Sequence, residues 1–172
     1  MGLHWRCPAD RRGFTLVEIL VVLVILGIAS AAVIPHIGND ADLQLAASSR
    51  LLVADLLYAQ NQAIVQQREH SVSFDTVAGV YQLTRTEDDS SETVLIHPTR
   101  KSPYIQALGT SERFDKVSID SVDFDSGSVI RFDTLGAPSN VNDIDHSNLV
   151  LRGGGNTLTI VVAPITGRIS VN

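Results

Sequence analysis

A long apolar run near the start of the chain limits what this protein can fold into. Residues 14–34 contain a single charged side chain, Glu18. As a helix rising about 1.5 Å per residue, the run measures on the order of 31 Å, close to the roughly 30 Å hydrocarbon core of a bilayer. We therefore expect residues 14–34 to form a transmembrane helix.

The charges that precede this run predict its orientation. Three arginines, Arg6, Arg11 and Arg12, stand before it against Asp10. Because positive charge keeps its end of a span in the cytoplasm, the rest of the chain is expected on the other side. Two alternatives remain open. One is a plain single-span anchor. The other is a secretory signal peptide, because Ala29-Ser30-Ala31 could imitate its cleavage site, although the apolar core of a signal peptide has only about 7–15 residues.

Glu18 is the anomaly in the run. An acidic side chain at the centre of a bilayer costs about 2.5–3.5 kcal/mol, and somewhat less nearer an end, so such a group is usually functional and has a partner. A cut after Gly13 would supply one, because the new amine of Phe14 would lie at the same depth as Glu18 of a neighbouring copy. This arrangement is that of a subunit in a helical filament.

Residues 12–18, Arg-Gly-Phe-Thr-Leu-Val-Glu, resemble the prepilin peptidase motif of type IV pilins and type II secretion pseudopilins. The resemblance implies that residues 1–13 are a prepilin leader, that a membrane peptidase cuts between Gly13 and Phe14, and that it methylates the Phe14 amine. It implies that Glu18 pairs with that amine during subunit assembly. It also implies a single-pass protein of the bacterial inner membrane, with a periplasmic C-terminal domain that joins a periplasmic filament.

Residues 35–68 are expected to form the amphipathic half of a long N-terminal helix. Pro35 allows either a kink or a break with a restart capped by Asp40 or Asp42, and the resemblance favours the kink. Over 43–65, apolar side chains recur at helical spacing, which predicts a buried stripe. The stripe consists of Leu45, Leu52, Leu56, Ala59 and Ala63. We expect it to pack on the protein's own sheet, with additional contact to neighbouring subunits as the alternative.

The chain after residue 69 shows the period-two alternation of β-strands. Strands are expected at 70–75, 79–84, 93–97, 117–124, 128–133, 148–151, 156–162 and 168–171. The polar segments 86–92 and 98–114 are expected to be exposed loops. Short strands with tight turns indicate an antiparallel sheet. The fold class is therefore α+β, with a periplasmic β-rich domain over 69–172.

The C-terminal segments 130–138 and 158–169, together with helix positions such as Asp55 and Arg68, resemble the minor pseudopilin H group and the FimT minor pilins. This implies a type IV pilin-like fold, with other pseudopilins, the prepilin peptidase and the inner-membrane secretion platform as partners. The leading interpretation is a minor pseudopilin of a type II secretion system, whose pseudopilus drives export of folded proteins. The alternative is a FimT-like minor pilin, acting in pilus assembly or DNA uptake. The third possibility is an unrelated anchored periplasmic domain, or an enzyme, in which the motif is coincidental.

The charge balance argues against nucleic acid as a partner. The chain has 13 basic and 19 acidic residues; removing residues 1–13 takes away three arginines and one aspartate, which leaves 10 and 18. Affinity for phosphates depends on Lys and Arg, and the basic residues concentrate only at Arg100-Lys101 and at Arg113 with Lys116. The single cysteine, Cys7, lies in the leader, so the mature chain would have no disulfide, which favours a pseudopilin or a minor pilin.

No catalytic, metal or cofactor site is expected. The five histidines, His4, His36, His70, His97 and His146, lack ligand spacing and are expected at the surface or in loops. Residues 140–145 offer oxygen ligands for calcium but lack the glycine and distal glutamate of an EF-hand loop, so a solvated loop is expected. The sequence also lacks a nucleophile elbow and a phosphate loop. We therefore expect a protein that is not an enzyme.

Overall fold

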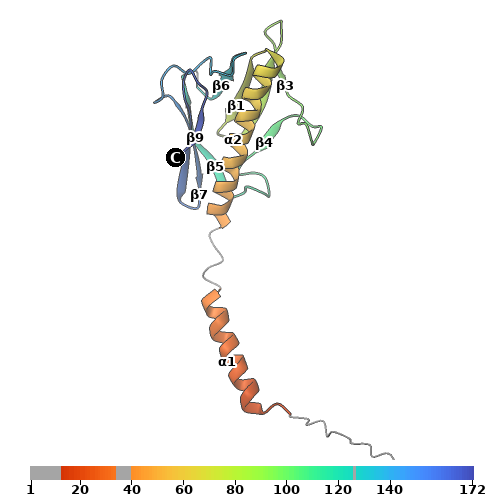
Figure 1. The fold of residues 1–172 in the computed structure, drawn as a ribbon, viewed down its shortest axis with the longest axis vertical. Coiled ribbons are helices and arrows are strands. Elements are labelled where there is room, and N and C mark those ends of the chain that lie inside the picture. The colour runs from red at the N-terminus through yellow and green to blue at the C-terminus, as the bar shows by residue number, and fades with distance from the viewer. Residues whose placement is uncertain (1–12, 34–39, 126) are drawn as a thin grey trace, which may run out of the picture. The chain divides into compact units, whose positions relative to one another are not determined.

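The structure, a computed structural model, describes residues 13–33, 40–125 and 127–172 (Figure 1). The chain divides into two compact units, residues 1–38 and 39–172. In the first unit, α1 spans Leu16–Val33, and every residue from 13 to 30 is exposed. The choice between a kink and a break at Pro35 falls outside the described residues.

The second unit begins with α2, which spans Asp40–Gln66 and contains the predicted helical stretch 43–65. Asp40 and Asp42 lie in its first turn, where the positive end of the helix dipole favours acidic side chains. The helix ends in a Schellman motif: Gln67 has a φ of 52°, and the Arg68 N–H donates to the Ala63 carbonyl at 3.3 Å. This left-handed residue turns the chain into the first strand.

The predicted apolar stripe of α2 is buried. Its five members are at most 3% exposed, and they are Leu45, Leu52, Leu56, Ala59 and Ala63. The helix contacts strands of both sheets of the unit. Because burial of one leucine side chain contributes about 1.5–3 kcal/mol, the stripe fixes α2 on its own sheets, as expected.

The first sheet contains five antiparallel strands. They are β1 (His70–Asp75), β2 (Val80–Thr86), β3 (Glu92–Val94), β4 (Ile105–Ala107) and β6 (Val129–Phe132). The strand order is β3-β2-β1-β6, and β4 pairs with β2 beyond the end of β3.

The hairpin of β1 and β2 confirms the predicted one. Its register runs from His70 opposite Arg85 to Asp75 opposite Val80. Gly79 in the turn has a φ of 64°, and a Cβ there would collide with the carbonyl oxygen of Leu108. Glycine is therefore required at this position both by the backbone conformation and by the close approach of the chain after β4.

The second sheet contains the remaining four strands, also antiparallel. They are β5 (Val117–Phe124), β7 (Ser147–Gly153), β8 (Asn156–Val162) and β9 (Ile169–Val171), in the order β5-β7-β8-β9. A register shift interrupts the pairing of β5 with β7 between Ile119 and Ser121. Alternate residues of β7 are buried, which is the period-two pattern that predicts strands in this region.

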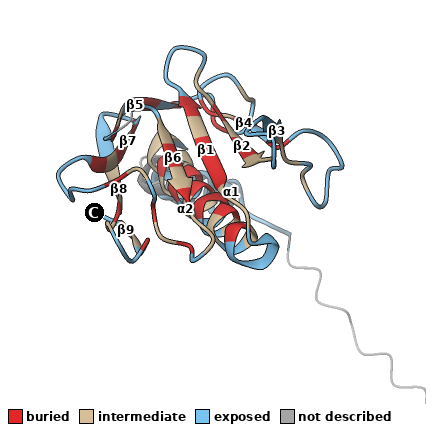
Figure 2. Cartoon of the chain, turned by 90° about the horizontal axis from the view of Figure 1, so that it is seen from above, coloured by how far each residue is buried: buried red, intermediate tan, exposed pale blue. Residues whose placement is uncertain are grey.

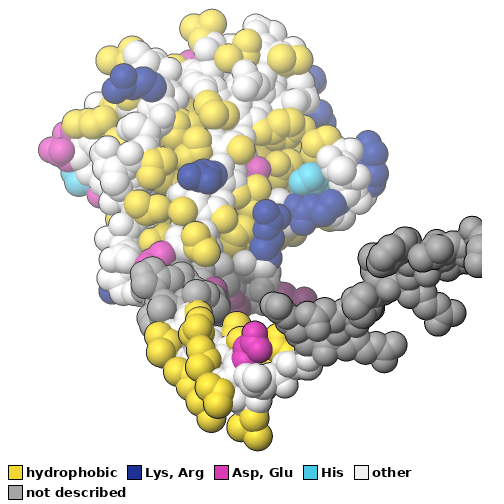
Figure 3. Space-filling view, turned by 60° about the horizontal axis from the view of Figure 1, so that its bottom comes forward, with side chains coloured by type: hydrophobic (Ala, Val, Ile, Leu, Met, Phe, Trp, Pro, Cys, Tyr) yellow, Lys and Arg dark blue, Asp and Glu magenta, His cyan; other side chains and the backbone are white. Residues whose placement is uncertain are grey.

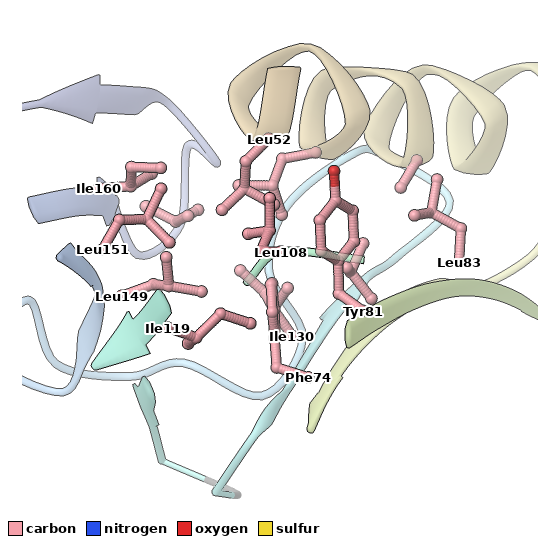
Figure 4. Close-up of a cluster of buried hydrophobic side chains, with 14 of the residues drawn as sticks. Leu52, Phe74, Tyr81, Leu83, Leu108, Ile119, Ile130, Leu149, Leu151 and Ile160 are labelled. Carbon is pink, nitrogen blue, oxygen red and sulfur yellow. The ribbon is translucent and has the colours of Figure 1, made fainter. Parts of the chain in front are cut away.

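The hydrophobic core lies where α2 meets the two sheets (Figure 4). Tyr81 and Leu83 of the first sheet, Leu151 and Ile160 of the second, and Leu52 of α2 are each at most 1% exposed. Figure 2 shows the buried positions on the helix and along the strands, with exposed positions concentrated in the connecting loops. One core therefore holds both sheets and the helix together.

The structure confirms an α+β fold with antiparallel sheets, with three differences. The β-rich region forms two sheets rather than one, and β4 lies inside segment 98–114, where an exposed loop is predicted. With Ile105 exposed and Gln106 buried, three residues are too few to give a periodic signal, and the strand is defined by its pairing with β2. The expected strand 93–97 ends at Val94, and Ile96 forms only an isolated bridge to Pro103.

Candidate functional site

The N-terminus of α1 is capped by a threonine hydroxyl. The Thr15 Oγ1 accepts a hydrogen bond from the Glu18 N–H at 3.2 Å, and the Thr15 carbonyl accepts from the N–H groups of Glu18 and Ile19. Helix N-termini carry unpaired N–H groups, and a Ser or Thr side chain at this position satisfies one of them. Thr15 therefore fixes where the helix begins.

Glu18 lies three residues after this cap, in the first helical turn. The spacing Thr-x-x-Glu is that of a capping box, and a carboxylate here faces the positive end of the helix dipole. The sequence interpretation of Glu18 as an assembly residue did not include this capping role, although the Thr-x-x-Glu spacing is readable in the sequence. Helix capping is thus a second physical reason for a glutamate at this position, independent of any neighbouring subunit.

The predicted cleavage junction is open to solvent in the first unit. A side chain built on Gly13 would meet no atom within 4 Å, and Phe14 is 77% exposed. Within the described residues, no cation forms an ion pair with Glu18. Gly13, Phe14 and Glu18 thus lie close together in sequence on an uncovered segment, and their expected roles remain predictions.

The predicted span 14–34 has a counterpart in α1, which contains 18 residues. At about 1.5 Å per residue this helix measures roughly 27 Å. Among the described residues, no helix combines the length and the apolar character needed to cross a membrane. The transmembrane assignment therefore rests on the sequence.

In the second unit, α2 presents a mostly apolar face to solvent. Exposed positions recur at alternating spacings of four and three along the helix, and they are Leu43, Ala47, Arg50, Ala54, Leu57, Asn61 and Ile64. We call this set the outer face of α2. An alternation of three and four is the spacing of helix–helix seams, so the geometry of this face suits packing against another helix.

A buried carboxylate links α2 to the first sheet. Asp55 Oδ2 accepts the Tyr81 hydroxyl at 2.6 Å, and Oδ1 accepts the Tyr104 hydroxyl at 2.9 Å. Burial raises the pKa of Asp55, and both tyrosine hydrogen bonds oppose that rise. Burial also raises the pKa of Tyr81 and Tyr104, so both remain neutral donors. Sequence reasoning singled out Asp55 only by resemblance and missed both tyrosines, since they lie 26 and 49 residues away.

The expectation that the histidines lie at the surface or in loops is wrong for His70. His70 lies on β1 and is fully buried, because position 70 begins a core strand. Its Nδ1 lies 3.0 Å from the Arg68 carbonyl, and burial lowers its pKa. His146 is exposed as expected, and its hydrogen bond to Asp123 raises its pKa. His4 and His36 lie outside the described residues.

Segment 140–145 uses its polar groups in local hydrogen bonds. Both the backbone and the side-chain nitrogen of Asn142 donate to Asp125 Oδ2, and the Asp145 N–H donates to Asp143. Asn140 binds the backbone of Arg131 and of Val129. Across the described part of the chain, no three His, Cys, Asp or Glu side chains come together as a potential metal site.

Comparison with known proteins gives one sequence pattern and one fold. The prokaryotic N-terminal methylation motif matches residues 8–34, which include Gly13, Phe14 and Glu18. No curated protein sequence matches the chain closely enough to count as a relative.

Two solved structures of a minor pseudopilin have a similar fold, and a minor pilin has a lower TM-score. One structure of the minor pseudopilin EpsH from the Type 2 Secretion System of Vibrio cholerae has a TM-score of 0.55 at 11% identity, covering 75% of this chain and 96% of that one. A second EpsH structure has a TM-score of 0.55 at 10% identity, covering 74% and 92%. The type IV minor pilin FimU of Pseudomonas aeruginosa has a TM-score of 0.49 at 16% identity, covering 76% and 90%.

At these identities the likeness concerns the fold, and the methylation motif concerns only the N-terminal segment. The two observations are independent, because one rests on residues 8–34 and the other on about three quarters of the chain. They agree with the resemblance carried by residues 12–18. The chain carries a prokaryotic N-terminal methylation motif and has a fold similar to that of the minor pseudopilin EpsH.

Proposed function

We propose that this chain is a minor pseudopilin of the H type, a structural subunit of the pseudopilus of a type II secretion system. The observation that carries the proposal is the combination of a methylation motif over residues 8–34 with a fold similar to that of the minor pseudopilin EpsH. The proposed role is structural rather than catalytic, because both solved structures of similar fold are of a minor pseudopilin of a secretion system.

In this proposal, residues 1–13 are removed by a prepilin peptidase and the new amine of Phe14 is methylated. The apolar segment 14–34 holds the subunit in the bacterial inner membrane, with the β-rich unit in the periplasm. This membrane placement is supported by the apolar composition of the segment and by the arginines before it. Other pseudopilins and the inner-membrane secretion platform are the partners.

Assembly would use two contacts. The carboxylate of Glu18 would pair with the Phe14 amine of a neighbouring subunit, which sets the register between subunits; buried charge pairs are best supported in such specificity roles. The outer face of α2 would pack on helices of neighbouring subunits, because its seam spacing and its leucine, isoleucine and alanine side chains suit helix packing.

The processing step has a direct test. The protein is purified from its own host and its N-terminal peptide is analysed by mass spectrometry, with a strain lacking the prepilin peptidase as the control. We expect Phe14 at the N-terminus with one added methyl group. An N-terminus elsewhere, or unchanged maturation in the control strain, would contradict the proposal.

The second candidate is a FimT-like minor pilin of a type IV pilus, which shares the methylation motif. Deletion of the gene separates the two. Loss of export of folded proteins with normal pili supports the pseudopilin, whereas loss of pili or of DNA uptake with normal export supports the pilin. A salt-sensitive gel shift with DNA would also favour the pilin, because phosphate contacts weaken with salt.

A further inference from the structure

A cleft of about 590 Å³ opens beside β4, in the segment 98–114 that was predicted to be an exposed loop. Residues of two loops, 97–100 and 111–114, line it on either side of β4, and Leu51 of α2 contributes to its wall. This volume is in the range of small-ligand sites. The cleft therefore has the size of a binding site, and its side chains indicate the ligand.

Two arginines line the cleft, Arg100 and Arg113. Arg68, Arg85, Arg131 and Arg152 each pair with a carboxylate. The described residues contain no ion pair of Arg100 or Arg113, nor of Arg50 or Arg168, which lie outside the cleft. The Arg113 guanidinium lies 5.1 Å from the centre of the Phe114 ring, which orients it by a cation–π contact. In a chain with an excess of acidic residues, two unpaired guanidinium groups in one cleft favour an anionic ligand. Figure 3 shows Lys and Arg side chains gathered beside a histidine on this unit.

Gln106 gives an independent indication of a ligand. It lines the cleft and is 8% exposed, yet its buried Nε2 has no hydrogen-bond partner among the described residues. A buried amide nitrogen without an acceptor is costly and rare in native proteins. Because this nitrogen is closed off from solvent, a ligand oxygen in the cleft would provide the missing acceptor once the Gln106 side chain turns toward it.

The loop that carries Arg100 is fixed before any ligand binds. The His97 Nδ1 accepts the N–H groups of Thr99 and Arg100 at 3.2 and 3.3 Å, and the Lys101 N–H donates to the His97 carbonyl. The His97 ring stacks on the Tyr104 ring with 4.6 Å between the ring centres, and the Tyr104 hydroxyl donates a hydrogen bond to buried Asp55. A preorganised loop binds at a lower entropic cost.

The edge of β4 indicates that the ligand is a peptide. β4 pairs with β2 on one side, and no described strand pairs with its other edge. Part of this edge is already used, because the Ile105 N–H donates to the Pro103 carbonyl and the Ala107 carbonyl accepts the Ser111 hydroxyl. The remaining backbone groups of the edge can still pair with an extended chain. Ile105, 47% exposed, lies beside Leu51 and Phe114 among the lining residues and offers apolar surface for a neighbouring side chain.

We propose that this cleft binds an extended acidic segment of a partner protein, with a carboxylate held by Arg100, Arg113 and the Gln106 amide. An apolar residue next to the carboxylate would lie against Ile105 and Phe114. Nucleic acid fits less well, because it presents a row of phosphates and the cleft offers two guanidinium groups in an acidic chain. The proposal does not depend on whether the filament serves secretion or a pilus.

The test uses the full chain in detergent micelles and a fluorescein-labelled peptide in which two aspartates flank a leucine, with fluorescence anisotropy as the readout. We expect saturable binding that weakens with salt and falls roughly tenfold or more in the double variant Arg100→Gln/Arg113→Gln. Arg152→Gln is the matched control, because Arg152 is exposed, lies on β7 and pairs with Asp120. It should bind like the unchanged chain.

Three outcomes would overturn the proposal. The first is equal binding of a peptide with asparagines in place of the aspartates, or equal binding by the double variant. The second is tighter, Arg100-dependent binding of a single-stranded oligonucleotide, which would make the cleft a nucleic-acid site. The third is complete displacement of the labelled peptide by inorganic phosphate, at phosphate concentrations that leave other anion-dependent complexes intact. That result would make the cleft a simple anion site. Circular dichroism of each variant checks that the fold is retained.

Discussion

The Tyr81 hydroxyl donates a 2.6 Å hydrogen bond to Asp55 Oδ2, and this buried contact joins α2 to the middle of the first sheet. Both residues are inaccessible or nearly so, at 0% and 4% exposure. Tyr104 completes the site from the segment before β4. A carboxylate that accepts two hydroxyl groups thus connects three segments that are distant in sequence.

Removal of the Tyr81 hydroxyl tests the energetic weight of this contact. Tyr81→Phe should lower the free energy of unfolding by about 1.5–3 kcal/mol, because hydrogen bonds to a charged group contribute in that range. Tyr58→Phe is the matched control, since Tyr58 stacks on Tyr104 and the described residues give its hydroxyl no hydrogen-bond partner. Denaturant unfolding followed by circular dichroism measures both. Equal losses in the two variants would contradict the assignment.

The raised pKa of Asp55 predicts a pH dependence with a definite sign. The native state holds the proton more tightly than the unfolded state, so the group's stabilising contribution is greatest below its ordinary pKa of 3.8 and is lost as pH rises through the folded pKa. Asp55→Asn cannot titrate. The unfolding free energy of the unchanged chain, relative to this variant, should therefore fall as pH increases from about 3.8. Melting temperatures measured across that range provide the test, and parallel curves would count against it.

The pKa values of two histidines should lie on opposite sides of the ordinary value of 6.5. Burial lowers the pKa of His70, whereas hydrogen bonding to Asp123 raises that of His146. The contribution of neutral His70 is therefore complete above pH 6.5 and is lost as pH falls through its folded pKa. The contribution of His146 is complete below 6.5 and is lost as pH rises. Nuclear magnetic resonance titration of the imidazole protons measures both, and Asp123→Asn should return the His146 pKa toward its ordinary value.

Adjacent leucines of α2 separate folding from assembly. Leu56 is 1% exposed and Leu57 is 41% exposed on the outer face of α2. Leu56→Ala should cost about 2–5 kcal/mol of stability by leaving a cavity, and Leu57→Ala should cost less than about 1 kcal/mol. In a filament assembly assay, Leu57→Arg should fold yet assemble poorly. Normal assembly of Leu57→Arg would exclude this face as a subunit contact.

Glu18 has two physical explanations, and two substitutions distinguish them. Glu18→Gln keeps the capping-box side chain but removes the charge, while Glu18→Ala removes both. If pairing with the Phe14 amine governs assembly, both variants should be cleaved normally and both should assemble poorly. If helix capping governs it, Glu18→Gln should assemble and Glu18→Ala should not. Immunoblots of processed subunit and of sheared filaments give the two readouts.

Much of the fold was predictable from local pattern. The buried stripe of α2 follows from helical periodicity, and the hairpin of β1 and β2 follows from alternation with a turn at Gly79. Strands β5 and β8 match their predicted bounds, 117–124 and 156–162. These features were readable because residues within one element decide them.

The sequence was less informative where contacts are distant. β4 escaped detection because three residues carry no period, and its pairing with β2 defines it. Buried His70 resembled a surface residue, because one polar side chain at the start of a strand does not reveal what covers it. The N-terminal motif is the reverse case: residues 12–18 are recognisable in the sequence, and the structure adds the cap by Thr15.

By itself, the sequence determined the order of α2 and of the strands other than β4, the apolar N-terminal run with Glu18, and the predicted cleavage junction at Gly13 and Phe14. Only the tertiary structure decided that the strands form two sheets, that Asp55 meets Tyr81 and Tyr104, and that Arg100 and Arg113 line one cleft. Periodicity arises from neighbours within a few residues along the chain. Cavities and buried networks arise from packing between segments tens of residues apart, and no local pattern encodes that packing.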